Sequence, residues 1–365
     1  MMKTFILGTT AEGNTVYLGK SENSHILSIG RSGVGKSTTM TRYMEEAAYM
    51  GRRVIQIKWR NSVADESEQN TVIPMRVKRI RAAYEPIQIP LFKPVENADG
   101  SIEPQILMVD RVASLLSKSA NLSDAQTRKV KQAVASVAEG DFYDQEGISA
   151  IKCFLDSEGN SAVKASEKLS PFFTTNLLKN GDFLNSDAEV IVIDIDDFQL
   201  DQQVIIVEFL LRWIFFYGSK GGFKQRGIVV YIDEAQNLSY TPDSPMYLLL
   251  NESRKFNIAV FMAAPSLKAG GKRGMNIATM CGTTLYFKPL SADIDDIAGL
   301  IDPIFRADCA EALKHLPVGQ CMVTGNLIID GEIVSSPIRL VNTGCDRSVK
   351  ENTNGTSKQN TKRLC

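Results

Sequence analysis

Short runs of apolar, mostly β-branched residues recur along the chain without the alternation that marks a half-buried strand. They lie at residues 26–29, 54–57, 87–89, 190–195, 228–233, 258–263 and 283–287. A strand that is apolar at successive positions is covered on both faces, as in a parallel sheet with helices on each side. The pattern therefore predicts an α/β fold with a mainly parallel sheet flanked by helices.

This rhythm of strands stops between about Pro104 and Leu178. Apolar residues recur there at helical spacing, at Ile106, Val109, Val112, Ala113 and Leu116 and again at Val130, Val134 and Val137. Ser123-Asp124, Ser149 and Ser161 offer helix starts. We expect an all-helical insert at 104–185 that divides the core into 1–103 and 186–345.

The remaining segments complete the core. Two helices are expected at 292–300 and 307–315, and Asp330-Gly331 supplies the turn of a closing hairpin. Residues 346–365 are polar with few apolar side chains, which predicts a disordered tail.

Charge and composition narrow the class of protein. The 41 basic and 42 acidic residues leave a net charge of −1, so nucleic-acid contacts would come from local patches. The six cysteines form no C-x-x-C pair and there are two histidines, which disfavours structural zinc and a disulfide framework and fits a reducing cytosol. No signal peptide is apparent. Residues 204–217 contain Glu208 and Arg212 and are expected to form a buried helix, not a membrane span.

A phosphate-binding P-loop follows the first buried run. The chain reads Gly30-Arg31-Ser32-Gly33-Val34-Gly35-Lys36-Ser37, followed by Thr38. Its glycines allow backbone N–H groups to point at phosphates, Lys36 reaches the β- and γ-phosphates, and the Ser37 hydroxyl ligates Mg²⁺. Residues 38–50 predict the helix that must follow, and Gly51 is a natural stop. The chain is therefore predicted to bind a nucleotide through Gly30 to Thr38.

Two carboxylates end the buried run at residues 228–232. In P-loop enzymes an aspartate at this position holds the Mg²⁺ shell, and a neighbouring carboxylate deprotonates the attacking water. We assign these roles to Asp233 and Glu234. Asp194, Asp196 and Asp197 follow the preceding run, and we interpret them as a solvated loop that caps the next helix, with contact to the nucleotide site as the alternative.

At this point the chain resembles the HerA/FtsK superfamily of DNA-pumping ATPases, and within it the conjugative coupling proteins and type IV secretion ATPases. The similar segments are Asp233-Glu234-Ala235-Gln236-Asn237-Leu238, Glu252-Ser253-Arg254-Lys255-Phe256-Asn257-Ile258, Leu316-Pro317-Val318-Gly319-Gln320, and the lead-in Ile6-Leu7-Gly8 with Asn14-Thr15-Val16-Tyr17. The resemblance extends from about Phe5 to Leu340. It implies a RecA-like core that assembles as a ring, usually a hexamer, with ATP and Mg²⁺ between subunits and DNA or a protein substrate in the pore.

The resemblance also implies an arginine that acts on the neighbouring subunit's nucleotide. Arg254 is the first candidate and Arg306 the second. The basic segment 266–274, with Lys268, Lys272 and Arg273, suits a pore loop that contacts a phosphate backbone, or a plain solvated connection. The basic run at 76–81 is interpreted as a solvated helix face, with a nucleic-acid role as the alternative.

Two departures from the family pattern affect the expected site. The strand at 258–263 normally ends in a glutamine that senses the γ-phosphate, but here Ala263-Ala264-Pro265-Ser266 follows. Either Ser266 or Gln236 replaces that amide, or hydrolysis is slow or differently coupled. Lys58-Trp59-Arg60 also replaces an aspartate often found after the second strand, so Trp59 either stacks on a ligand or caps the sheet edge.

Together these features predict an ATP-hydrolysing ring motor that translocates DNA. The alternatives are a type IV secretion-type ATPase that energises protein or nucleoprotein transfer, and an assembly switch that hydrolyses ATP slowly. A small-molecule kinase is disfavoured because no lid-like arginine cluster is apparent. The P-loop begins at residue 30 and no membrane segment is apparent, so we expect a cytoplasmic homo-oligomer that borrows a membrane-bound or nuclease partner.

Overall fold

A nine-stranded sheet forms the centre of the computed structural model, which describes residues 4–19, 23–60, 75–96, 100–157, 159–267, 277–334 and 337–343. In spatial order its strands are β15 (Ile338–Leu340), β12 (Cys321–Gly325), β11 (Thr283–Tyr286), β3 (Ile26–Ile29), β10 (Ile258–Ala264), β9 (Ile228–Ile232), β4 (Arg53–Lys58), β8 (Val190–Asp194) and β5 (Val77–Arg81). All neighbours from β11 to β5 are parallel, whereas β12 pairs antiparallel with β11 and β15. The predicted α/β class is confirmed.

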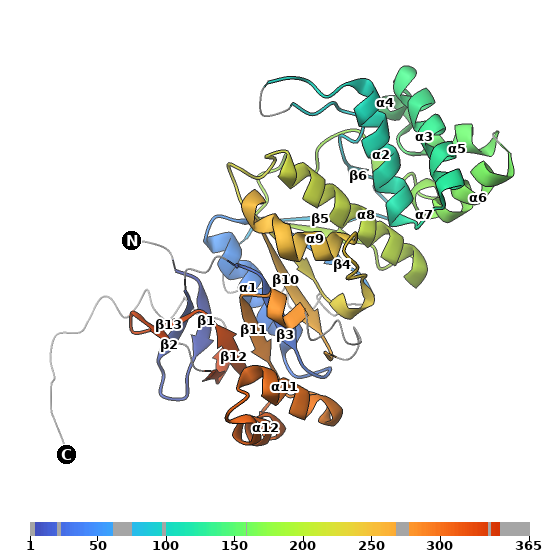
Figure 1. Cartoon of the computed structure of the whole chain (residues 1–365). Coiled ribbons are helices and arrows are strands. Elements are labelled where there is room, and N and C mark those ends of the chain that lie inside the picture. Colours follow the sequence, from blue (N-terminus) through green and yellow to red (C-terminus); the bar gives the residue numbers. More distant parts are fainter. Residues whose placement is uncertain are drawn as a thin grey trace, which may run out of the picture.

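The sheet is covered on both faces, which explains the unbroken apolar runs (Figure 1). One face packs against α1 (Lys36–Tyr49) and a five-stranded antiparallel sheet. That smaller sheet has the order β14 (Glu332–Val334), β13 (Leu327–Ile329), β2 (Thr15–Leu18), β1 (Ile6–Thr9) and β16 (Asn342–Thr343). The other face packs against α8 (Leu200–Ser219), α9 (Pro245–Glu252), α11 (Ile294–Ile301) and α12 (Arg306–Lys314). Each face has its own hydrophobic core: the first core lies on the side of α1, and the second lies on the side of α8. Within β9, Val229 and Tyr231 belong to the first core, and Val230 and Ile232 belong to the second.

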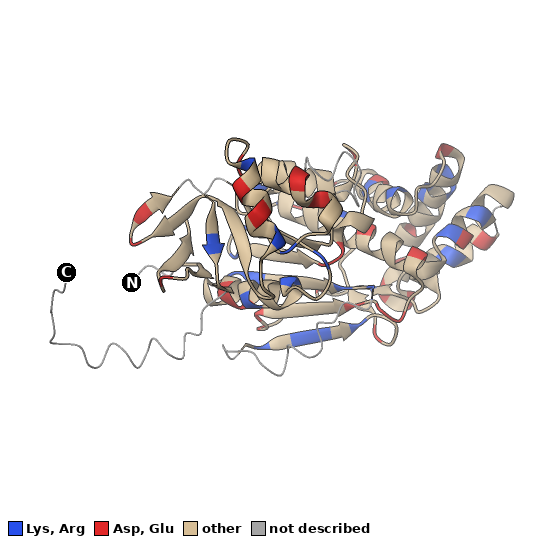
Figure 2. Cartoon of the chain, turned by 90° about the horizontal axis from the view of Figure 1, so that it is seen from below, with Lys and Arg blue, Asp and Glu red and all other residues tan. Residues whose placement is uncertain are grey.

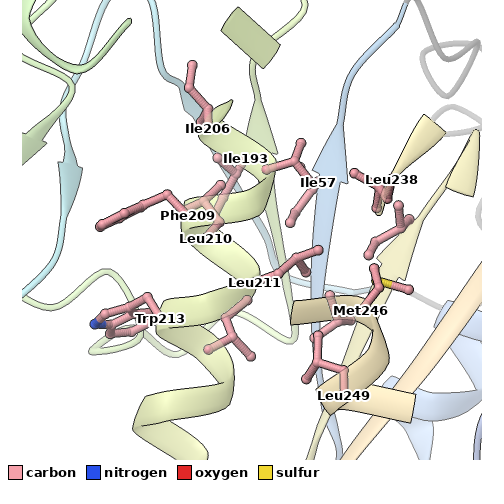
Figure 3. Close-up of a cluster of buried hydrophobic side chains, with 14 of the residues drawn as sticks. Ile57, Ile193, Ile206, Phe209, Leu210, Leu211, Trp213, Leu238, Met246 and Leu249 are labelled. Atoms are coloured by element: carbon pink, nitrogen blue, oxygen red, sulfur yellow. The ribbon is translucent and has the colours of Figure 1, made fainter. Parts of the chain in front are cut away.

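Helix α8 is the largest apolar element of the second core. Phe209, Leu210 and Leu211 are fully buried on it. Leu211 points toward the side of Ile57 of β4, whereas the Phe209 ring points to the opposite side of the helix (Figure 3). This burial confirms the prediction of a buried helix around residues 204–217. Among the described residues, no helix combines the length and apolar character needed to cross a membrane.

Six helices fill the interval between β6 (Ile87–Gln88) and β7 (Leu178–Lys179), and they extend to one side of the core (Figure 1). They are α2 (Gln105–Ser119), α3 (Asp124–Glu139), α4 (Phe142–Glu146), α5 (Ser149–Asp156), α6 (Asn160–Lys168) and α7 (Ser170–Phe173). Helix α3 begins with a capping box in which Ser123 and Gln126 each bond the other's backbone N–H. The segment expected to be wholly helical also contains β7. β7 pairs with β6 in a separate two-stranded sheet. The run at 87–89 was expected to form a strand of the central sheet, and it does not.

The basic run at 76–81 is an edge strand and not a helix face, which corrects the sequence interpretation (Figure 2). Arg76 pairs with Asp187 and Glu189, Arg79 with Asp194, and Arg81 with Asp197. Charged side chains on an edge strand discourage pairing with another chain. The strand was missed because it lacks the continuous apolar run of the strands inside the sheet.

The short elements near the strand ends are η2 (Ala235–Asn237), η3 (Ser253–Phe256) and η5 (Ser291–Asp293). The predicted hairpin at Asp330-Gly331 is confirmed, because β13 pairs with β14 and both turn residues have positive φ. The polar tail at 346–365 lies outside the described residues.

A buried histidine makes the stability of this sheet depend on pH. His25 precedes β3, and its Nδ1 accepts a hydrogen bond of 3.0 Å from the Val260 backbone N–H of β10. Burial is the main cause that lowers the pKa of His25 to about 4 from 6.5. The unfolded chain binds a proton between these values while the folded chain does not, so the free energy of unfolding falls as the pH drops from about 6.5 to 4.

We therefore expect the unmodified protein to lose about 2 kcal/mol more stability than His25→Asn between pH 7 and pH 5. The Asn Oδ1 keeps an acceptor near the position of Nδ1 for the Val260 N–H but does not titrate. Urea unfolding of both proteins at the two pH values measures the difference. Equal losses in the two proteins would show that His25 does not stay neutral in the folded chain.

Candidate functional site

The P-loop connects the end of β3 to the start of α1. Gly30, Gly33 and Gly35 have φ values of 155°, 77° and 101°. Gly35 is the N-cap of α1 and provides no side-chain cap, so the first N–H groups of the helix are free of intrahelical and capping partners. An uncapped helix N-terminus after a glycine-rich turn binds anions through these N–H groups and the helix dipole.

Two segments from the far end of the chain hold the loop in this shape. A Cβ atom on Gly30 would lie 2.7 Å from the Phe287 Cβ, and one on Gly35 would lie 3.1 Å from the Gly319 Cα. Arg31 N–H donates to the Lys288 carbonyl at 3.1 Å, and Gly319 N–H donates to the Val34 carbonyl at 2.9 Å. Gly30 and Gly35 are therefore required both by backbone conformation and by close packing. The remaining predicted binding residues divide by exposure: Ser32 and Thr38 are exposed, and Val34 is buried.

The structure brings Lys36, Ser37 and Asp233 together. The Lys36 ammonium donates to the Arg31 carbonyl at 2.9 Å and so lies over the loop. Burial lowers the pKa of Lys36, and the charges of Asp233 and Glu234 oppose that change. The Ser37 hydroxyl donates to Asp233 Oδ2 at 3.1 Å across 196 positions of sequence.

These groups fit a magnesium ion with a phosphate ligand. The Ser37 hydroxyl and the Asp233 carboxylate are the oxygen ligands that Mg²⁺ prefers. Burial raises the pKa of Asp233, which means that burial disfavours the charged carboxylate. A bound cation would offset this effect by favouring the charged form. Ser37 and Asp233 are the residues that would hold the ion.

Two aromatic residues adjoin Asp233: Trp59, for which the sequence left two interpretations open, and Tyr231, which the sequence did not single out. The Trp59 indole N–H donates to the Asp233 carbonyl at 2.8 Å, and Trp59 is 0% exposed. Its buried indole rules out a ring that stacks on a ligand, and it caps the end of the sheet from inside. Tyr231 is buried on β9 two residues before Asp233, and burial together with the charge of Asp233 raises the pKa of its phenol. The sequence signal for Trp59 was its place directly after β4, the parallel neighbour of β9.

Glu234 is presented on a strained turn. Its φ is 50°, in the left-handed region that is uncommon for residues other than glycine. Its backbone N–H donates to Asp233 Oδ1 at 2.9 Å, and its side chain accepts a hydrogen bond from Gln236 Nε2. A left-handed residue directly after Asp233 is the kind of local strain that concentrates at functional sites.

The ends of β4 and β8 carry a buried ion-pair cluster. Lys58 Nζ lies 3.5 Å from carboxylate oxygens of both Asp194 and Asp196, and Arg79 lies 3.2 Å from Asp194. Asp194 is therefore part of a buried network, and its interpretation as part of a solvated loop is wrong. Lys58, which directly precedes Trp59, is therefore held at the end of β4 by carboxylates of the neighbouring strand and its following loop.

Arg254 lies away from the loop, at the opposite end of the sheet. Arg254 is exposed in η3, directly before β10, and its charge lowers the pKa of His25 before β3. Both positions are at the amino ends of parallel strands, whereas the P-loop follows the carboxyl end of β3. A strand of seven residues spans about 20 Å. Arg306 is exposed at the start of α12. Lys268, Lys272 and Arg273 lie outside the described residues.

Solved structures with a similar fold include VirB4 and the bacterial conjugative coupling protein TrwB. VirB4 of Thermoanaerobacter pseudethanolicus matches with a TM-score of 0.63 and 15% identity, over 92% of this chain and 96% of that one. The bacterial conjugative coupling protein TrwB without its first 70 residues matches with a TM-score of 0.56 and 13% identity, over 88% and 87%. TrwB in complex with ADP and Mg²⁺ matches with a TM-score of 0.54 and 12% identity, over 87% and 85%.

These likenesses show that the chain has a RecA-like P-loop NTPase fold, as predicted. Neither a protein-family model nor a curated protein matches the sequence. The assignments of individual site residues therefore depend on the geometry described above.

The close packing of the loop leads to a test of its function. We expect Gly35→Ala to abolish binding of a fluorescent ATP analogue, because the added methyl group meets Gly319 and the φ of 101° becomes strained. Gly51→Ala is the matched control: its φ is 88°, nothing lies within 4 Å of the added Cβ, and it lies at the other end of α1. Equal binding by both variants would contradict the role given to the loop.

Proposed function

We propose that this chain hydrolyses ATP with Mg²⁺ and uses the energy to translocate DNA. In this proposal six identical subunits form a ring. The observation that carries the proposal is the Ser37–Asp233 hydrogen bond beside Glu234, at the foot of a P-loop in a RecA-like fold. A phosphate cradle alone would support binding. A carboxylate next to the metal position adds the means to hydrolyse.

Each residue has a distinct part in the proposed reaction. The P-loop N–H groups and the Lys36 ammonium bind the β- and γ-phosphates and hold them in line. Ser37 and Asp233 hold Mg²⁺, which neutralises charge that develops on the transferred phosphoryl group. Glu234 accepts the proton of the attacking water, so its carboxylate must be ionised before the water attacks. Trp59 fixes the backbone of Asp233 through its carbonyl.

The position of Arg254 supports a ring. An exposed arginine at the end of the sheet opposite the P-loop cannot reach the phosphates of its own subunit. In a head-to-tail ring, each subunit presents one surface to the site on a different surface of its neighbour. Arg254 then neutralises charge in the neighbouring site, with Arg306 as the second candidate.

A basic segment of the chain and a solved structure with the same fold both support DNA as the substrate. The basic segment with Lys268, Lys272 and Arg273 follows β10 at the carboxyl edge of the sheet, and we propose that it contacts a phosphate backbone in the pore. TrwB, which has the same fold, is described as a bacterial conjugative coupling protein. We place the ring in the cytoplasm with a membrane-bound or nuclease partner.

Two alternatives retain specific support. The match to VirB4 favours an ATPase that energises protein or nucleoprotein transfer in type IV secretion. The apolar end of β10 at Ala264-Pro265 favours a switch that hydrolyses ATP slowly. Stimulation by DNA separates the motor from both.

We expect Mg²⁺-dependent ATP hydrolysis that double- or single-stranded DNA stimulates. Lys36→Ala should lose ATP binding, because the cationic partner of the phosphates is removed. Glu234→Gln should bind ATP with turnover reduced at least a hundredfold, because the base is removed while the shape is kept. A phosphate-release assay and nucleotide titration measure both effects. Unchanged turnover in Glu234→Gln would remove the base assignment, and turnover insensitive to DNA would favour the alternatives.

A mixing experiment tests whether Arg254 acts between subunits. Arg254→Ala retains an intact P-loop, and Lys36→Ala retains Arg254, so each should be inactive alone while a mixture regains part of the turnover. Lys255→Ala is the matched control, since Lys255 is the exposed neighbour of Arg254 and pairs with Glu252. Native mass spectrometry with ATP identifies the ring. A mixture that stays inactive although mixed rings form would place the arginine elsewhere.

A further inference from the structure

The strand between the two nucleotide motifs ends without a polar side chain. β10 pairs with β3 on one side and with β9 on the other, so its carboxyl end stands between the P-loop and Asp233. Ala263 and Ala264 end the strand and Pro265 follows. A hydrolytic site of this kind needs a group that orients the base and the attacking water. That group must come from another element.

Ser266 is the nearer candidate in sequence, but it is engaged elsewhere. Its hydroxyl donates a short hydrogen bond to Asp293, which is 2% exposed. Asp293 belongs to η5, which follows β11 and not β9. The Ser266 hydroxyl is therefore bound to a buried carboxylate of η5.

Gln236 lies beside the same strand end and contacts the base. It borders a cavity of about 20 Å³ together with Ile29, Ala264 and Ser266, so its side chain adjoins the ends of both β3 and β10. Its Nε2 donates to Glu234 Oε2. Its Oε1 is buried and has no hydrogen-bond partner among the described residues.

The turn that carries Gln236 is held from several directions. Asn237 Nδ2 donates to the Glu234 carbonyl at 3.1 Å, and the Tyr240 hydroxyl donates to the Ala235 carbonyl at 2.8 Å. Together with the left-handed backbone of Glu234, these bonds fold the chain so that residues 234 and 236 meet. The contact between the amide and the base is therefore built into η2 and does not depend on a flexible loop.

We propose that Gln236 is the positioning residue of this site: its amide fixes the Glu234 carboxylate and takes the place of a polar side chain at the end of β10. The inference rests on the proposed ATP hydrolysis and adds a residue to it. It also favours hydrolysis over a slow switch, because the amide that β10 lacks is provided by the turn after β9.

The test compares steady-state ATP hydrolysis of the unmodified chain with Gln236→Met, which keeps the length of the side chain but loses both hydrogen-bonding groups. We expect kcat to fall about tenfold to a hundredfold, as for loss of a hydrogen bond to a charged group, with KM for ATP within about twofold. Gln236→Glu, which replaces the donor with a charge beside Glu234, should lower kcat at least as far. Gln132→Met, an exposed glutamine on α3, is the matched control and should leave both constants unchanged.

A double variant tests whether the function belongs to an amide at this edge. Pro265→Gln added to Gln236→Met should recover several-fold in kcat, because it returns an amide to the end of β10. If the double variant folds and its kcat is no higher than that of Gln236→Met, the idea that the Gln236 amide replaces a polar group at the end of β10 is wrong.

The remaining outcomes separate this inference from the proposed function. Normal kcat in Gln236→Met or Gln236→Glu would overturn the role of Gln236 while leaving ATP hydrolysis intact. A fall in kcat in Ser266→Ala with normal kcat in Gln236→Met would assign the role to Ser266. A rise in KM together with a fall in thermal stability in Gln236→Met would indicate that Gln236 has a structural role only. Absence of turnover in the unmodified chain, with ATP still bound, would overturn the proposed function itself.

Discussion

The hydrogen bond between Ser37 and Asp233 is the contact on which the site depends. It joins the first turn of α1 to the end of β9, although β10 separates β9 from β3 in the sheet. The contact is possible because parallel strands end at one edge, so groups from distant positions in sequence meet there. This order gives the intervening strand a particular importance, since whatever ends β10 faces both motifs.

Much of the site could be predicted from the sequence because its parts are local. The P-loop and the Asp233-Glu234 pair each directly follow a strand that is buried on both faces, and such strands are continuous apolar runs. Elements that depend on distant partners were not predictable in the same way. β5 has three basic residues and only two apolar ones, Val77 and Ile80, in no regular alternation, and its strand character depends on its pairing with β8 and on the acids nearby. The indole bond of Trp59 likewise depends on which strand lies beside β4.

The buried charges beside the site act as a support for Trp59. Lys58 immediately precedes Trp59 and is bound by Asp194 and Asp196 from the next strand. Removing one partner of such a cluster leaves an uncompensated buried charge and typically costs about 3–5 kcal/mol. The cluster thus holds the ends of β4 and β8 together, and with them the indole that fixes Asp233. A lysine is compatible with this buried position because Asp194 and Asp196 compensate its charge.

Helix α8 connects the parts of the molecule that the proposed function must coordinate. It packs against α2 of the helical segment and against η3, which carries Arg254. Its Arg212 donates to the Asp243 carbonyl at 2.9 Å, in the connection that leads from Glu234 to α9. A buried, closely packed helix of this length moves as a unit, because its core contacts tolerate little change in shape. In the proposed ring, a displacement of the helical segment would be transmitted through this one helix both to the connection after Glu234 and to Arg254 in η3. This arrangement suits an enzyme whose sites are completed by neighbours.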